Sequence, residues 1–225
     1  MEKTLSGIEA IFFDIDGTLS DSDDQIIEEI VKRIRFLHFL WKDPLLRKFA
    51  RSIVSLSMAF FNSIFHIVDS LGLDNFIAKT FPHKHPQNRD DFEKDFNLIA
   101  GVEKMIAILH TRYRLGIVSA RSEPGVMHFL KQFSLEKYFD VVVAAQTCYY
   151  TKPFPHPLLF AAEMVNVLPE KCLMVGDTMV DILAGKAAGM KTIGVLCGFG
   201  TLKELRKAMA DFILASPAEL VSLLD

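Results

Sequence analysis

The sequence predicts an α/β fold in which a doubly wound parallel sheet carries an inserted, all-helical domain. Three observations lead to this fold. Residues 8–13 read IEAIFF, a β-branched and aromatic run that is typical of a short buried strand. From residue 101 onward, strand-like runs alternate with helical patterns, which indicates a parallel sheet with helices on both faces. Between residues 20 and 98 no strand pattern appears, so this segment is expected to be an insertion.

The segment after the first strand is expected to be helical. Residues 26–40 place their apolar side chains on one stripe. A second helix is expected to start with Asp43 as its cap and Pro44 in its first turn, and to continue to about Gly72. The insertion is therefore expected to form a helical cap domain over residues 21–97.

After the insertion, strands and helices alternate to the end of the chain. The expected helices are GVEKMIAILHTR, EPGVMHFLKQF, HPLLFAAEMVNVL and MVDILAGKAAG, and the expected strands are LGIVSA, DVVVAAQ, CLMVGD, TIGVLC and ADFIL. A final helix is expected to open with a capping box from Ser216 to Glu219. Residues 1–20 and 98–225 would together form the core domain.

Composition narrows the class of protein. The chain has 225 residues, of which 50% are hydrophobic and 24% charged, and its net charge of −3 does not suggest a nucleic-acid partner. Its three cysteines are scattered and form no CxxC pair, which favours a reducing, cytoplasmic location. The first residues lack the pattern of a signal peptide.

Residues 52–68, SIVSLSMAFFNSIFHIV, form a long apolar stretch without a fixed charge. A spanning helix needs about 20 apolar residues, and Asn62 and His66 interrupt this one. We expect it to be buried within the cap domain, with a homodimer interface or a pocket for an apolar substrate tail as hypotheses. Peripheral membrane contact is the less favoured alternative.

Polar residues gather where several expected strands end. Asp14, Ser119 and Asp177 each follow such a strand, and ligands bind at the carboxyl ends of strands in sheets of this kind. Asp14 and Asp16 stand two residues apart, and such a pair of like charges costs free energy unless a cation offsets it. Asp181 follows Asp177 by one helical turn. Four carboxylates at one edge of a sheet could bind a hard cation such as Mg²⁺.

The same edge offers groups that could bind a phosphate. Lys152 precedes a proline-rich loop and could balance both the carboxylates and a phosphate. Ser119 and backbone N–H groups near the next helix could donate hydrogen bonds to phosphoryl oxygens, and Gly17 allows the backbone to approach a ligand closely. An anionic nucleophile, an acid/base partner, a metal and surrounding donors suit phosphoryl transfer.

Four segments of the chain resemble the motifs of haloacid dehalogenase-like hydrolases, and in particular the branch of phosphoglycolate phosphatases and pyrophosphatases. They are DIDGTL, the serine of IVSAR, the lysine of TKPFPHP, and VGDTMVDILAGKAAGM. They occur in order, each in the expected strand context, over residues 8–20 and about 100–200. The SAR sequence departs from the commoner threonine-containing second motif, and residues 21–97 contain no recognisable substrate motif.

The resemblance implies a role for each matching residue. Asp14 would be the nucleophile that forms an aspartyl-phosphate, and Asp16 the acid/base residue. Mg²⁺ would be held by Asp14, the backbone carbonyl of Asp16, and Asp177, with Asp181 as a ligand or supporting group. The residues expected to bind phosphate are Gly17, Thr18, Ser119, Ala120, Arg121 and Lys152. The family's dehalogenases lack the second aspartate, so Asp16 favours a phosphatase or a phosphomutase.

The predicted activity is hydrolysis of a small phosphorylated metabolite, either a phosphoglycolate-like monoester or pyrophosphate. A phosphomutase of the same fold is one alternative, and a phospho-accepting binding or signalling module with little turnover is another. Structural interpretations also stay open: Ser119 could cap a helix, Lys152 could be a solvated loop residue, and Asp181 could only cap or pair at a helix start. His83, Lys84 and His85 could reach a substrate from the cap domain, although such polar loops are usually just exposed.

Overall fold

A computed structural model of the chain describes residues 5–21 and 96–224. The chain divides into two units, Met1–Ser22 with Asp91–Asp225 and Asp23–Asp90, and the described residues all belong to the first. The predictions for residues 26–72, for the apolar stretch 52–68 and for His83, Lys84 and His85 lie outside the described residues. Among the helices that are described, none is both long enough and apolar enough to cross a membrane.

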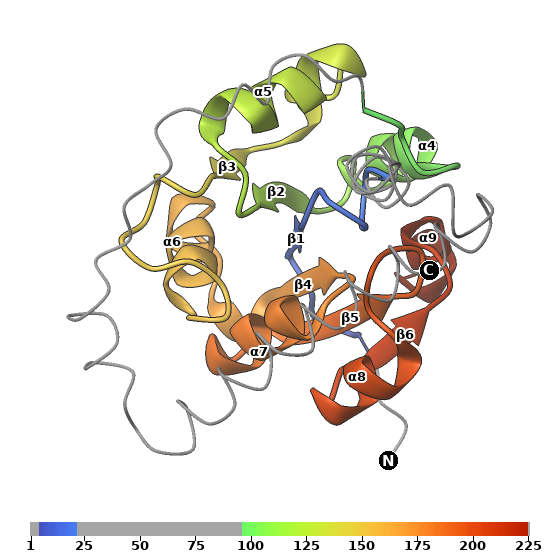
Figure 1. Ribbon diagram of the computed structural model, residues 1–225. Helices are drawn as coiled ribbons and strands as arrows, with labels where there is room; N and C mark the ends of the chain where they lie inside the picture. The colour runs from blue at the N-terminus through green and yellow to red at the C-terminus, as the bar shows by residue number, and fades with distance from the viewer. Residues whose placement is uncertain (1–4, 22–95, 225) are drawn as a thin grey trace, which may run out of the picture. The chain divides into compact units, whose positions relative to one another are not determined.

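The described part of the chain contains a parallel sheet of six strands in the order β3-β2-β1-β4-β5-β6 (Figure 1). Its strands are β1 (Ala10–Phe13), β2 (Arg114–Val118), β3 (Val141–Val143), β4 (Cys172–Gly176), β5 (Lys191–Val195) and β6 (Phe212–Leu214). β1 lies at the centre of the sheet, where the strand order reverses, with Phe13 beside Ile117 of β2 and Val175 of β4. This reversal is the point at which ligands bind in doubly wound sheets.

Helices cover both faces of the sheet, as the alternating pattern predicts. They are α4 (Val102–Leu109), α5 (Glu123–Gln132), α6 (His156–Met164), α7 (Met179–Ala187), α8 (Leu202–Lys207) and α9 (Leu220–Leu224), with short 3₁₀ turns η2 (Glu136–Tyr138), η3 (Pro169–Lys171) and η4 (Pro217–Glu219).

The two faces have separate cores because side chains alternate along each strand. Ile11 and Phe13 of β1 pack with α4, α5 and α9, whereas Ala10 and Phe12 pack with α6 and α7. All four side chains of β1 are fully buried. The alternation therefore holds the end of β1, and the residues that follow it, between two packed layers.

Two details of the predicted elements are wrong. Helix α8 was not predicted, although its Thr201 and Glu204 form a capping box: the Glu204 carboxylate accepts from the Thr201 N–H at 2.9 Å, and the Thr201 hydroxyl accepts from the Glu204 N–H at 3.3 Å. At the last helix the predicted box is only half formed. The Ser216 hydroxyl accepts from Ala218, but the Glu219 carboxylate reaches past Ser216 to the N–H of Ala215. A 3₁₀ turn at this point shifts the partner by one residue.

The two ends of the inserted segment leave the core side by side. The N–H of Asp21 donates to the carbonyl of Asn97 at 2.8 Å, and the N–H of Ile99 donates to the carbonyl of Leu19 at 3.0 Å. Ser20 and Leu98 form an antiparallel bridge between these two segments. The chain thus leaves and re-enters the core through one short paired segment, close to the aspartates that follow β1.

Candidate active site

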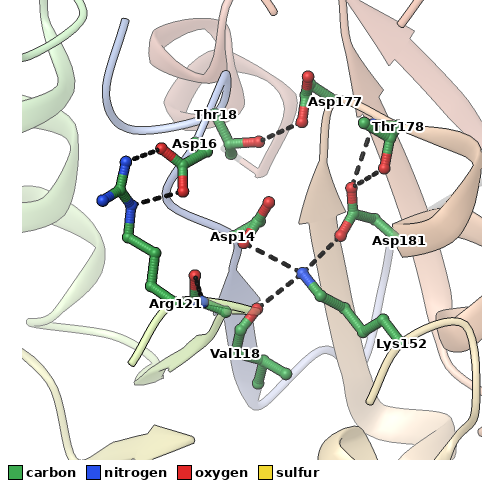
Figure 2. Close-up of polar contacts among 10 residues, drawn as sticks. Asp14, Asp16, Thr18, Val118, Arg121, Lys152, Asp177, Thr178 and Asp181 are labelled. Carbon is green, nitrogen blue, oxygen red and sulfur yellow. Dashed lines mark hydrogen bonds and ion pairs between the residues drawn. The ribbon is translucent and has the colours of Figure 1, made fainter. Parts of the chain in front are cut away.

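Segments from four places in the chain meet at the carboxyl ends of the central strands (Figure 2). Asp14 follows β1, Ser119 follows β2 and Asp177 follows β4, as the sequence predicts. Lys152 comes from the loop between β3 and α6, and Asp181 lies in the first turn of α7. The predicted meeting of these residues at one edge of the sheet is therefore found in the structure.

Lys152 lies at the centre of the site, and each N–H donor of its ammonium group has an acceptor. It contacts the carboxylates of Asp181 at 2.6 Å and Asp14 at 3.1 Å, and it donates to the carbonyl of Val118 at 2.8 Å (Figure 2). A lysine has three N–H donors, so these acceptors account for all of them. Burial by itself would lower the pKa of Lys152, but Asp14 and Asp181 outweigh burial and raise it. The side chain is 5% exposed, which excludes the alternative of a solvated loop lysine.

Asp14 experiences opposite influences. Burial raises its pKa, Lys152 lowers it, and the neighbouring Asp181 and Asp16 raise it further, so that the pKa lies at about 7. One ammonium group therefore does not compensate for all the carboxylates around it. An additional cation near these carboxylates would offset this negative charge.

Three carboxylates could supply that cation with ligands. Asp14, Asp177 and Asp181 are all buried, and one carboxylate oxygen from each lies within 4.8 Å of the others. Asp177 is held by the N–H of Phe199 at 2.7 Å and lies 3.5 Å from the hydroxyl of Thr18. Hard oxygen donors of this kind suit Mg²⁺.

Asp181 caps the start of α7, as one of the two interpretations of the sequence predicts, and it also pairs with Lys152 in the site. One of its oxygens contacts Lys152, and the other accepts from the N–H and the hydroxyl of Thr178 at 3.1 and 2.7 Å. These bonds cap α7. Asp181 thus supports the start of the helix and also faces the site.

Asp16 faces a different partner from Asp14. Both of its carboxylate oxygens accept from Arg121, from Nε and from a terminal nitrogen, each at 2.6 Å (Figure 2). Arg121 was expected to bind phosphate, and the structure places its guanidinium group on Asp16. The Asp16 side chain lies outside the three-carboxylate cluster, so only its backbone carbonyl stays a candidate metal ligand.

Ser119 and Ala120, which follow β2, complete the edge of the site. Ser119 is 6% exposed, and its hydroxyl accepts from the N–H of Arg121 at 3.2 Å. Ser119 and Ala120 line a small pocket together with Lys152 and Tyr150. Of the residues expected to bind phosphate, Ser119, Ala120 and Lys152 line this pocket, whereas Gly17, Thr18 and Arg121 do not. A larger hollow lies at the opposite end of β1 and β2, and none of the predicted site residues lines it.

Two glycines allow the chain to pack tightly around Asp177. Gly17 has a φ of +74°, and a Cβ atom there would lie 2.4 Å from Oδ2 of Asp177. A Cβ atom on Gly198 would lie 2.2 Å from the same oxygen and 2.5 Å from the carbonyl of Gly17. The contribution of residues 197–200 was missed in the sequence, although glycines directly after a strand mark a close backbone approach.

Comparison with known proteins gives the family. The chain matches the haloacid dehalogenase-like hydrolase family over residues 11–195. The chain is a member of that family. It is similar to the pyrophosphatase PpaX of Anoxybacillus flavithermus, with 31% identity over 96% of this chain and 97% of the relative. It is also similar to PpaX of Bacillus mycoides, with 28% identity over 97% of each chain.

Solved structures agree with this fold. A provisionally named β-phosphoglucomutase from Thermotoga maritima has a TM-score of 0.66 at 25% identity, over 96% of this chain and 98% of that one. A haloacid dehalogenase-like hydrolase from Streptococcus pneumoniae has a TM-score of 0.68 at 21% identity, over 98% of this chain and 100% of that one. The predicted family, the α/β core and the class of phosphatase-type hydrolase are thereby confirmed.

Proposed function

We propose that the chain is a Mg²⁺-dependent phosphatase that hydrolyses a small phosphorylated metabolite through a phosphorylated Asp14. The observation that carries this proposal is the cluster of the Asp14, Asp177 and Asp181 carboxylates, of which Asp14 and Asp181 also contact the ammonium group of Lys152. Carboxylates this close together repel one another, and Lys152 offsets only part of their charge. The oxygen donors of the cluster fit a divalent cation better than they fit any purely structural role.

The metal would be held by Asp14, Asp177 and the backbone carbonyl of Asp16, with Asp181 beside them. When bound, Mg²⁺ would neutralise negative charge on the carboxylates and on the phosphoryl group. The remaining chemistry belongs to the chain. Lys152 orients the Asp14 carboxylate through its 3.1 Å contact and supplies positive charge next to it.

The reaction would proceed in two steps. In the first, an oxygen of Asp14 forms a bond to phosphorus while the bond from phosphorus to the leaving oxygen breaks, and Asp16 gives that oxygen a proton. In the second, Asp16 takes a proton from water, the water oxygen bonds to phosphorus, and the bond to Asp14 breaks. Inorganic phosphate leaves and both aspartates return to their starting states. Ser119, Lys152 and the N–H groups after β2 would bind the transferring phosphoryl oxygens.

The substrate class is proposed from the relatives. Both PpaX relatives are pyrophosphatases by name and match 97% and 96% of this chain, which favours pyrophosphate, with a phosphoglycolate-like monoester as the alternative. The similarity to the Thermotoga maritima protein favours a phosphomutase as the second candidate. A phosphomutase would have to retain the phosphoryl group on Asp14 long enough to transfer it to a second substrate hydroxyl.

The direct test is phosphate release from p-nitrophenyl phosphate with Mg²⁺, followed by a panel of pyrophosphate, phosphoglycolate and sugar phosphates. We expect phosphate to accumulate over many turnovers. Release of one equivalent of p-nitrophenol without release of phosphate would instead identify a phospho-accepting module, and isomerisation of a sugar phosphate without phosphate release would identify a mutase.

The first prediction concerns the nucleophile. Asp14→Asn keeps the size of the side chain but removes the attacking charge, so turnover should nearly vanish while circular dichroism shows an intact fold. Asp16→Asn should lower turnover by about 10²–10⁴-fold, because proton transfer is lost but the nucleophile stays. An Asp14→Asn protein with wild-type turnover would refute the mechanism.

Further parts of the proposal concern residues outside the described part of the chain. We propose that residues 21–97 form a helical cap that selects the substrate, that residues 52–68 form a homodimer interface or a substrate pocket, and that the protein is cytoplasmic. Sedimentation of Phe60→Glu against the wild type tests the dimer, since a charged side chain at the interface should dissociate it. Flotation with anionic liposomes tests the membrane alternative.

A further inference from the structure

The acid/base role requires Asp16 to be held in one orientation, and the structure shows what holds it. Its side chain is 28% exposed and follows the end of a strand, so packing alone does not fix its position. Arg121 binds both carboxylate oxygens at 2.6 Å. A planar guanidinium group that engages both oxygens fixes the plane of the carboxylate as well as its position, which a single contact cannot do.

Arg121 is itself held from two sides. Its backbone N–H donates to the hydroxyl of Ser119 at 3.2 Å, which fixes the start of the side chain. Its guanidinium carbon lies 4.7 Å from the centre of the Phe96 ring, a cation–π contact. This contact joins Arg121 to the segment through which the chain re-enters the core, because Phe96 belongs to that segment.

Phe96 is fixed to α5 through its backbone. Its N–H donates to Oε1 of Gln132 at 2.9 Å, and its carbonyl accepts from Nε2 of Gln132 at 2.9 Å. Its ring is 5% exposed and meets the ring of Phe129 edge-on, with centroids 5.3 Å apart. One glutamine thus satisfies both backbone groups of Phe96 and holds the ring against a buried partner.

We infer that Arg121 is the positioning residue for Asp16, and that Phe96, held by Gln132, keeps Arg121 in place. The inference rests on the proposed function, because it assigns a kinetic purpose to the orientation of Asp16. Contacts thus run without a gap from α5 through Phe96 and Arg121 to the acid/base carboxylate. Any shift of the segment at Phe96 would therefore change the position of Asp16.

This role differs from the phosphate-binding role expected for Arg121, and a double-mutant cycle separates the two. Arg121→Met should lower turnover of p-nitrophenyl phosphate by about 10²-fold, since small misplacements of a catalytic group have effects of that size. The turnover of Arg121→Lys should lie between that of the wild type and that of Arg121→Met, because lysine keeps the charge but lacks the planar guanidinium group. In an Asp16→Asn background, Arg121→Met should change turnover by less than about 3-fold, because residues that act through one another are not additive.

Additive losses would overturn the inference. If Arg121→Met costs a further 10²-fold or so in the Asp16→Asn background, then Arg121 acts on the substrate and not through Asp16. Arg114→Met is the matched control, because Arg114 pairs with Asp140 on the surface at the other end of β2. That variant should keep wild-type turnover.

The leaving group provides a second readout that a general loss of structure would not change. In the pre-steady state, Arg121→Met should slow the release of phenol from phenyl phosphate more than the release of p-nitrophenol, because the poorer leaving group depends more on the proton from Asp16. Equal slowing of both releases would contradict the inference.

Phe96→Leu tests the outer part of this chain of contacts. It keeps an apolar side chain but removes the ring face, and we expect turnover to fall roughly 3- to 10-fold. The same change in the Asp16→Asn background should have little effect. Phe133→Leu is the control, since Phe133 also meets Phe129 edge-on, whereas the ring beneath the Arg121 guanidinium group is that of Phe96. Equal effects of the two leucine variants would count against a specific role for Phe96.

These results are distinguishable from a failure of the proposed function. If the wild type releases no phosphate, or if Asp14→Asn keeps full turnover, the proposed function fails. If the wild type turns over and Asp14→Asn does not, the proposed function stands and the Arg121 cycle decides the inference.

Discussion

At the residue scale, the site separates its like charges by giving neighbouring aspartates different cations. Asp14 pairs with Lys152, and Asp16 pairs with Arg121 (Figure 2). The sequence predicts that Asp14 and Asp16 need compensating charge, and it identifies Lys152 as one source. It does not predict that Arg121 is the other, because an arginine two residues after a strand-end serine is equally compatible with phosphate binding.

Lys152 gives the clearest prediction at this scale. Lys152→Met preserves length but leaves Asp14 and Asp181 without their common cation, and removing one partner of a buried pair is strongly destabilising. In EDTA at neutral pH, the free energy of unfolding should fall by about 3–5 kcal/mol. Turnover should also collapse, because the lysine both orients the nucleophile and faces the phosphoryl group. Urea denaturation and phosphate release measure the two effects.

Lys186→Met is the control for that variant, because Lys186 also pairs with an aspartate, Asp211, but away from the site. It should lose less stability and keep its turnover. A Lys152→Met protein as stable as the wild type in EDTA would show that the carboxylates do not depend on the lysine.

At the element scale, the strands were predictable because each is a short apolar run between helical patterns, and such runs are typical of buried parallel strands. The ends of elements were less predictable. The predicted strands continue through residues 144–146 and 119–120, yet β3 ends at Val143 and β2 at Val118. Beyond these points the chain turns toward the site, and local propensity carries no information about where that turn begins. Helix α8 was missed because it has only six residues, too few to show an amphipathic period.

Asp211 joins three of these elements. It precedes β6, accepts from the N–H and hydroxyl of Thr192 in β5 at 2.9 and 3.1 Å, and pairs with Lys186 of α7. Burial alone would raise the pKa of Asp211, but the bonds from Lys186 and Thr192 outweigh burial and lower it. Asp211→Ala should therefore lower the free energy of unfolding by about 1–2 kcal/mol at pH 7.

The sign of the pH dependence follows from that lowered pKa. The stabilisation by Asp211 is fully present above the ordinary aspartate pKa of 3.8 and is lost as the pH falls through the lower pKa of the folded state. The difference in stability between the wild type and Asp211→Ala should shrink below about pH 4 in denaturation curves measured from pH 7 downward. A difference that stays constant down to pH 3 would mean that the charge of Asp211 is not what stabilises the fold.

At the scale of the whole molecule, the fold could be predicted more completely than the contacts within the site. The parallel sheet brings together residues that lie as far apart as Asp14 and Asp177, and the rule that strands end at one edge was sufficient to predict that meeting. What could not be predicted depends on long-range contacts: the support of Asp177 by Phe199 and Gly198, and the contact of Phe96 with Arg121. The glycine at 198 is a local sign of a close backbone approach, but no local pattern indicates which residue it approaches, and none pairs Phe96 with Arg121.

The last prediction concerns the metal and the stability of the whole core. Without a cation, three buried carboxylates face one lysine, so Mg²⁺ should bind the folded state and raise the free energy of unfolding. A Mg²⁺ concentration 100-fold above the dissociation constant would add about 2.7 kcal/mol. Turnover should disappear in excess EDTA and return with Mg²⁺. Ca²⁺ should also stabilise the fold, but its larger and looser shell should support little turnover.

Asp177→Asn makes this test specific, because it should maintain or raise the stability without metal and reduce the stabilisation by Mg²⁺. The amide keeps an oxygen that can accept from the N–H of Phe199, while one of the crowded charges is removed. In EDTA the variant should therefore be at least as stable as the wild type, yet Mg²⁺ should stabilise it much less. Asp211→Ala is less stable by the argument above but should keep the full increase with Mg²⁺. Equal stabilisation of the wild type and Asp177→Asn by Mg²⁺, in thermal melts with and without EDTA, would place the metal somewhere other than this cluster.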